Sequence, residues 1–305
     1  MDEIQKRLLE EIADLHEVPS GAYNIRANGG LAGRNTTANI DIITKEDKSG
    51  IDIKIKEGTK KESIHIPVVL SESGLTEMVY NDFFIEDDCD VVIVAGCGIH
   101  NGGDKKSQHD GIHRFFVGKN SKVKYVEKHY GSGEGTGERV MNPTTEVFLG
   151  ENAFMEMETV QIRGVDSTDR LTKAVLEEGA KIIVNEKLLT HGSQIAKTTF
   201  EVKLDGQDTS ANIVSRSVAK GDSKQIFLAK MEGNNKCAAH SECDAIIMDN
   251  AKISAIPEIT ANHLDAQMIH EAAIGKIAGE QIIKLMTLGL SEEEAEAQIV
   301  NGFLR

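Results

Sequence analysis

Three side chains near the C-terminal end of the sequence, Cys243, His270 and Glu271, have the chemistry needed to bind iron or sulfur. A thiolate, an imidazole and a carboxylate are all ligands for transition metals. The thiol lies between two acids in Glu242-Cys243-Asp244, and these neighbours are expected to raise its pKa unless a cation lies close by. In the simplest alternative, Cys243 is a small buried residue at the start of a strand.

The pair His270-Glu271 lies in a stretch rich in Ala, Ile and Gly. Adjacent residues on a strand point to opposite faces, so both can line one pocket only where the strand is irregular. His270 can equally be an ordinary hydrogen-bonded histidine. Glu271 requires a partner or an interface, because a carboxylate in an apolar run is costly to bury. His240 is the cation that could lower the pKa of the nearby thiol of Cys243.

A second group of candidates surrounds Cys97, which is followed by His100, His109 and His113. The spacing matches no standard zinc site, so metal binding competes here with a structural role. No two of the four cysteines form a C-x-x-C pair, and disulfides are not expected in a cytoplasmic chain.

Composition limits the class of partner. The chain of 305 residues has 34 Lys and Arg against 49 Asp and Glu, a net charge of −15. Nucleic acids and anionic membranes both require a basic surface, so neither is expected as the main partner.

No apolar run approaches the roughly 18 residues of a membrane span, and the N-terminus does not resemble a signal peptide, so we expect a cytoplasmic protein. The glycine-rich stretch 131–137 lacks the Lys-Ser/Thr of a P-loop, so ATP must be bound by a partner.

These candidates must be positioned by a β-rich fold. Residues 4–15 predict an amphipathic helix, and residues 21–36, rich in Gly and Asn, predict a loop. Strands are predicted from residue 40, and from Cys89 onward short apolar runs recur, roughly eight to twenty residues apart; between residues 90 and 265 only Leu171–Glu178 suggests a helical turn. Hairpin signals are sparse, which favours a mainly β fold of the parallel β-helix type over a sandwich or barrel, although no repeat of fixed length is visible.

The C-terminal end changes to a helical pattern. Residues 280–288 predict a helix that ends at Gly289, and the capping box at Ser291–Glu294 begins a second helix. We therefore divide the chain into an N-terminal helix and loop (1–36), a β-helix core (37–277) and a C-terminal helical segment (278–305).

The ordered motifs of the C-terminal half resemble the SufB/SufD family of iron–sulfur cluster assembly proteins. The matching segments are Glu242–Ala245, Ile256–Ile259, Ala266–Ile277, Gln281–Leu285 and Gly289–Leu304. A looser resemblance extends upstream to about residue 90: Gly118–Tyr125 is similar to the segment that follows the family's first cysteine motif, and Cys97 falls where that cysteine belongs.

The resemblance implies a right-handed parallel β-helix flanked by helices, which dimerises through the β-helix. It places the scaffold cysteine at Cys243, the essential glutamate at Glu271 and the histidine of the dimer interface at His270. It also implies that the C-terminal helices bind SufC, an ABC-type ATPase. The expected contacts to this ATPase are Gln281, Leu285, Gly289, Leu290, Glu294 and Ile299.

The residues after Cys97 depart from the family pattern, because Gly-Ile-His replaces the usual residues. Cys97 is a candidate for binding sulfur by position, and this departure leaves its role open. The roles of His100, His109 and His113 are open as well.

SufB and SufD divide the three reactive groups between two chains, whereas this chain holds all three. We therefore predict a SufB-like scaffold rather than an enzyme, working as a homodimer or in a SufB/SufD-like heterodimer. Cys243, His270 and Glu271 would be the metal ligands of a transient iron–sulfur cluster; no motif supports a flavin. Two alternatives are a SufD-like stabilising subunit, disfavoured by the presence of Cys243 and Glu271, and a carbohydrate-active β-helix enzyme, disfavoured by the absence of Trp.

Overall fold

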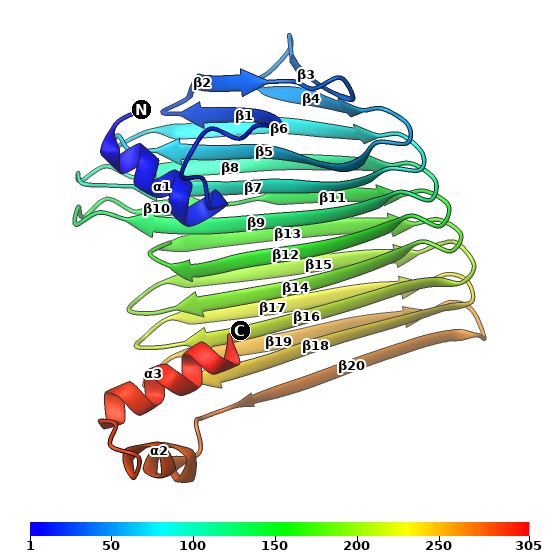
Figure 1. Cartoon of the computed structure of the whole chain (residues 1–305). Coiled ribbons are helices and arrows are strands. Elements are labelled where there is room, and N and C mark those ends of the chain that lie inside the picture. Colours follow the sequence, from blue (N-terminus) through cyan, green and yellow to red (C-terminus); the bar gives the residue numbers. More distant parts are fainter. Residues whose placement is uncertain (305) are drawn as a thin grey trace.

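Alternation of inward and outward side chains dominates the strands of the computed structural model, which describes residues 1–304. In β8 (Ser107–Val117) every second side chain is buried, from the first residue to the last. Such alternation is expected when one face of a sheet packs on a core and the other faces solvent. The strands form two sheets that face each other along an elongated solenoid (Figure 1).

The first sheet contains, in spatial order, β2 (Gly30–Asn35), β1 (Ala22–Ala27), β5 (Lys60–Leu70), β7 (Asp90–His100), β9 (Lys122–Ser132), β12 (Phe154–Arg163), β14 (Lys181–Thr190), β16 (Thr209–Ala219), β18 (Cys237–Ile247) and β20 (Ala266–Gly275). The second sheet contains β19 (Lys252–Ala261), β17 (Lys224–Gly233), β15 (Ile195–Leu204), β13 (Ser167–Leu176), β10 (Arg139–Met141) and β11 (Thr144–Leu149) side by side, then β8, β6 (Thr76–Ile85), β4 (Gly50–Ile55) and β3 (Ile40–Thr44).

Successive coils pair in parallel, which confirms the predicted parallel β-helix. The coil length varies: Thr209 pairs with Cys237, 28 residues on, whereas Lys122 pairs with Phe154, 32 residues on (237 − 209 and 154 − 122). Because insertions at the turns change this spacing, no repeat of fixed length is visible in the sequence.

The sequence-based predictions were wrong at two places. Residues 21–36 are not a loop but the hairpin β1–β2, whose turn residues Asn28 and Gly29 both have positive φ (47° and 79°). This is the requirement of a type I′ turn, and Asn-Gly is its preferred sequence. Leu171–Glu178 is not helical, because Leu171–Leu176 continues β13 with alternate side chains buried.

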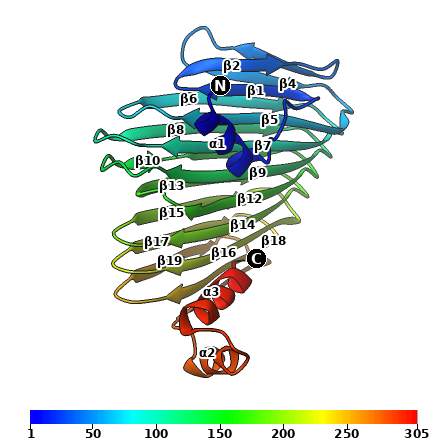
Figure 2. The same cartoon turned by 60° about the vertical axis from the view of Figure 1, so that its left-hand side comes forward.

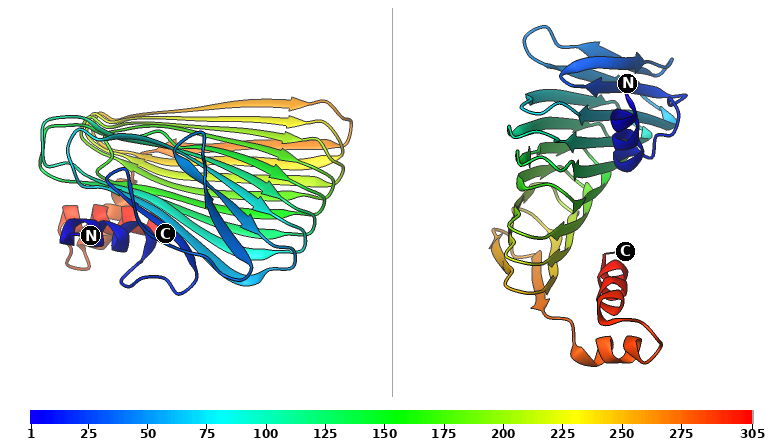
Figure 3. Two further views of the ribbon diagram at one scale, coloured as in Figure 1. Left: turned by 90° about the horizontal axis from the view of Figure 1, so that it is seen from above. Right: turned by 90° about the vertical axis from the view of Figure 1, so that its left-hand side faces the viewer.

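The two ends of the solenoid differ. At the N-terminal end, each sheet finishes in an antiparallel pair, β1–β2 or β3–β4, and the edge strands β2 and β3 are short, with 6 and 5 residues. At the other end (Figure 3), the edge strands β19 and β20 have 10 residues each, pair in parallel with β17 and β18, and have no second neighbouring strand within the described residues 1–304. An edge strand presents unpaired backbone groups, so this open end is available for pairing with another chain.

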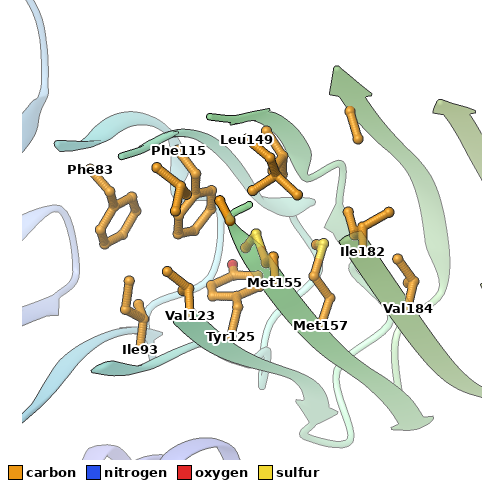
Figure 4. Packing of buried hydrophobic residues seen from close by; sticks show 14 of the residues in the cluster. Phe83, Ile93, Phe115, Val123, Tyr125, Leu149, Met155, Met157, Ile182 and Val184 are labelled. Atoms are coloured by element: carbon orange, nitrogen blue, oxygen red, sulfur yellow. The ribbon is translucent and has the colours of Figure 1, made fainter. Parts of the chain in front are cut away.

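Between the sheets lies one long apolar core (Figure 4). Phe83 and Phe115 stack with ring centroids 4.4 Å apart, and Tyr125 packs edge-on against Phe115 at 4.9 Å. Met155 and Met157 continue the core toward the C-terminal coils, as Figure 4 shows. With no Trp in the chain, large groups are few, and stacking of like side chains between coils fills the interior.

Helices flank the solenoid at both ends, as predicted (Figure 2). The helix α1 (Glu3–Ala13) buries Leu8, Leu9 and Ile12. At the other end, α2 (Gly279–Met286) and α3 (Glu292–Phe303) form a hairpin, and Ser291 makes the predicted capping box with Glu294. No helix in residues 1–304 has the length and apolar character that would be needed to cross a membrane.

Candidate functional site

Cys243 lies on β18 with its side chain in the interior, 1% exposed. Burial raises the pKa of this thiol to about 12, assisted by the negative charges of Glu186 and Asp244. The expected increase is therefore present, but its main cause is burial, and the stronger of the two carboxylates is distant in sequence. At neutral pH the thiol is protonated, so a ligand that binds the thiolate must displace a proton.

Glu186 lies on β14, separated from Cys243 by β16, and hydroxyl groups of β16 and of the facing sheet hold its carboxylate. Ser215 of β16, which pairs with Cys243, donates a hydrogen bond of 2.7 Å to Glu186 Oε2. Thr198 of β15 donates one of 2.9 Å to the other carboxylate oxygen. All three side chains are buried, so the charge of Glu186 acts on the thiol through an interior of low dielectric constant.

His270 and Glu271 lie on β20, the edge strand next to β18, and point to opposite faces as strand geometry requires. The His270 Nδ1 lies 2.7 Å from Ser241 Oγ, an inward hydroxyl two residues before Cys243. Burial lowers the pKa of His270, assisted by the charge of His240. The structure thus brings His270 to the inner side, near Cys243.

Glu271 lies on the outer face, with 68% of its side chain exposed. It pairs across the strands with Glu242, and its Oε2 is 3.5 Å from His240 Nε2. The three predicted ligands therefore do not form one cluster within a single chain. His240 reaches Glu271 rather than the thiol of Cys243.

Cys97 on β7 is enclosed in the interior, far along the chain from the open end. It lines a small cavity with His109, His113, Glu127 and His129. Burial, together with the charges of Glu77, Glu127 and Asp110, raises the pKa of Cys97 well above its usual value. Of the nearby histidines that the sequence singled out, His109 and His113 join this cavity.

His100 does not join it. Its Nδ1 lies 3.1 Å from the hydroxyl of Ser132, and its side chain lies in a different hollow, beneath Arg7 and Leu8 of α1.

A buried ion pair between Glu127 and Arg170 lies beside this cavity and was missed in the sequence. Burial alone would raise the pKa of Glu127, but the charges of Arg170 and His129 hold it well below its usual range. Arg170 also donates to His129 Nδ1 at 3.2 Å, and the Tyr125 hydroxyl donates to Glu127 at 3.1 Å. The sequence did contain one signal for this pair: in β9 and β13, Glu127 and Arg170 occupy inward positions of the alternation between buried and exposed residues.

Polar side chains continue through the interior from Cys97 toward Cys243. Arg170 and Glu186 line a second small cavity, together with Thr159, Gln161, Thr168 and Thr198. Glu186 in turn contacts Ser215 opposite Cys243. The interior therefore joins the two cysteines by a row of polar groups, alongside an apolar core.

Comparison with known proteins identifies the family. A family model described as "SUF system FeS cluster assembly, SufBD core domain" matches residues 74–303. The chain belongs to the SufBD family. It is 29% identical over 265 residues to an iron-sulfur cluster assembly SufBD family protein of Methanocaldococcus jannaschii, covering 85% of this chain and 83% of the relative. It is 31% identical over 264 residues to an iron-sulfur cluster assembly SufBD family protein of Archaeoglobus fulgidus, covering 85% and 69%.

The SufBD match begins just before β6 and runs to the end of α3, so it includes both cysteine regions and the C-terminal helices. Four of the predicted partner contacts lie on helices: Gln281 and Leu285 on α2, and Glu294 and Ile299 on α3. The remaining two, Gly289 and Leu290, lie in the turn between them, where Gly289 has a φ of +99°.

Proposed function

We propose that this SufBD family protein is a scaffold on which an iron–sulfur cluster is assembled transiently, with Cys243 as its main ligand. One observation carries the proposal: a buried thiol and an imidazole face the same interior one coil from an open end. A protonated thiol releases its proton only when iron or a partner supplies positive charge, which suits a site that holds its cluster temporarily.

The open end supports a homodimer. Two strand edges are exposed there, β19 and β20, and they carry the apolar side chains Ile256, Ile259 and Ile269 on their surfaces. Pairing of these edges with a second copy would satisfy the backbone groups and cover the side chains. It would also bring Cys243 and His270 of one protomer toward those of the other, and Glu271 to the rim of the same interface.

The C-terminal hairpin supports an ATPase partner of the SufC type. No residue of α2 is buried, and Ile283, Met286 and Leu288 are exposed, the last at 76%. An amphipathic helix without a covering element is a common docking surface for another protein. Closure of two ATPase subunits on two such hairpins would shift the dimer toward a state in which the cluster site opens. This cluster assembly, with its ATPase partner, would take place in the cytoplasm.

Cys97 is the second candidate for binding sulfur. The buried polar row that includes Arg170 and Glu186 connects the surroundings of Cys97 with those of Cys243, which supports a role for both thiols in binding sulfur.

Anaerobic reconstitution with ferrous iron and sulfide tests the cluster site. The wild type should develop visible absorbance from sulfur-to-iron charge transfer, and Cys243→Ser should lose most of it. Cys237→Ser is the matched control, since Cys237 is also buried on β18. Equal cluster content in wild type and Cys243→Ser would refute the assignment.

Co-elution with a SufC-type ATPase tests the partner. Leu285→Glu, on α2, should abolish binding, whereas Ile4→Glu, an exposed apolar position on α1, should not. Binding of the ATPase without any cluster would favour the SufD-like stabilising subunit instead.

A further inference from the structure

Three outward side chains lie close together at the open end, and the proposed scaffold function does not use them as a group. They are His240 and Glu242 of β18 and Glu271 of β20. One ligand atom from each lies within 4.8 Å of the others. The register of the two strands explains this proximity. Glu242 pairs with Glu271, and His240 lies two residues away on the same face of β18.

The histidine is already oriented for coordination. His240 Nδ1 lies 3.0 Å from the side-chain oxygen of Asn212, on the adjacent strand β16. Because an amide oxygen only accepts hydrogen bonds, Nδ1 carries the proton and Nε2 presents its lone pair toward Glu271. Metal-binding histidines characteristically donate their other ring nitrogen in this way, which fixes the tautomer and the plane of the ring.

The spacing fits a metal ion. His240 Nε2 and Glu271 Oε2 are 3.5 Å apart. If each were bonded to a metal at about 2.1 Å, the angle at the ion would be about 113°, close to the tetrahedral value. A direct hydrogen bond would bring the two atoms closer, to about 2.8 Å.

The local charge also favours a cation. The carboxylates of Glu242 and Glu271 lie together beside one imidazole, a third carboxylate, Asp244, interacts with Glu242, and the charge of Arg216 also reaches Glu242. Like charges at this density repel one another unless a cation lies between them. Imidazole with two carboxylates suits zinc, iron or manganese, whereas calcium and magnesium prefer oxygen ligands alone.

We propose that His240, Glu242 and Glu271 of one chain bind a single divalent transition-metal ion on the outer face of the open end, separate from Cys243. With three protein ligands, the ion keeps a coordination position for water or an incoming group. The metal site itself does not depend on the scaffold role. Its use as a store of ferrous iron beside the cluster site rests on the proposed function.

Cobalt(II) titration of the purified full-length protein under anaerobic conditions tests the site. The wild type should bind one ion per chain and show visible d–d absorbance without the intense near-ultraviolet band of thiolate ligation. His240→Ala and Glu242→Gln should each weaken binding at least tenfold, and Asn212→Ala should weaken it about tenfold through the orienting hydrogen bond. Circular dichroism checks that these variants fold.

Two controls separate this site from the cluster site. His263→Ala removes an exposed histidine at the same end and should bind cobalt like the wild type. Cys243→Ser should also bind cobalt normally, even though it is expected to lose cluster reconstitution. Unchanged binding in both His240→Ala and Glu242→Gln would overturn the proposal, as would loss of binding in Cys243→Ser together with a thiolate band in the wild type.

Discussion

Cys97 and Cys243 are both buried thiols in the interior of one solenoid, yet their surroundings differ. Cys97 lies among complete coils, next to a network in which Glu127 and Arg170 neutralise each other. Cys243 lies one strand from an unpaired edge, and the carboxylate near it, Glu186, accepts hydrogen bonds from the hydroxyls of Thr198 and Ser215. The comparison shows that burial alone does not define a reactive site. What distinguishes Cys243 is its nearness to an end of the fold that a partner can cover or open.

The largest effect is expected in thiol chemistry. Raising the pKa of Cys243 from 9.0 to about 12 lowers its thiolate fraction at pH 8 by about a thousandfold. Alkylation of Cys243 in the folded protein should therefore be at least about a thousandfold slower than in the urea-unfolded chain, since burial limits access of the reagent as well as ionisation; mass spectrometry measures both rates. Cys97 should react only through unfolding. If Cys243 reacts within tenfold of its unfolded rate, its protonated state is refuted.

The next effect concerns the network beside Cys97. Arg170→Met should destabilise the fold by about 3–5 kcal/mol, because it leaves the buried charge of Glu127 unpaired. Lys173→Met is the matched control on the outer face of the same strand. There the Lys173–Glu201 pair is exposed, and the loss should be at most about 1 kcal/mol. Urea unfolding measures both. Equal losses would show that the interior pair is no more important than a surface pair.

The same network should also make stability depend on pH through His113, which lies 2.8 Å from the Tyr125 hydroxyl. Burial lowers the pKa of His113 from 6.5 to about 4. The unfolded chain therefore binds this proton first, and stability is lost as the pH falls from 6.5 toward 4, by about 3 kcal/mol in total. Between pH 7 and pH 4, His113→Gln should lose correspondingly less stability than the wild type. An NMR titration midpoint near 6.5 for His113 would contradict this expectation.

The sequence predicts the parts of this molecule that depend on local pattern. Alternation of apolar and polar residues predicts the strands, and Ser291 with Glu294 predicts the start of α3. The ordered C-terminal motifs indicate the family, which the match over residues 74–303 confirms. The hairpin β1–β2 was missed although Asn28-Gly29 is a strong turn signal, because the glycine-rich surroundings were interpreted as loop.

Contacts between coils could not be predicted, because they depend on register. His240 lies opposite Ile269 and therefore near Glu271, a relation fixed only by the length of the coil that runs from β18 through β19 to β20. Likewise, Glu186 and Cys243 are 57 residues apart (243 − 186), and two coils of different length separate them. With no fixed repeat to align the coils, the sequence predicts which side chains point inward but not which residues of the adjacent coils they contact.

The smallest effect on stability is expected at the open end, and it sharpens the contrast with Arg170. Glu271→Gln changes a side chain that is 68% exposed, so the free energy of unfolding should shift by no more than about 0.5 kcal/mol. Cluster reconstitution should nevertheless fall strongly, since Glu271 lies at the rim of the proposed interface. Glu258→Gln, an exposed glutamate of β19 paired with Lys230 at 3.1 Å, should be equally neutral for stability and should retain the cluster. A functional loss without a stability loss would assign Glu271 to binding; parallel losses in both variants would instead mean that the open end contributes only to the fold.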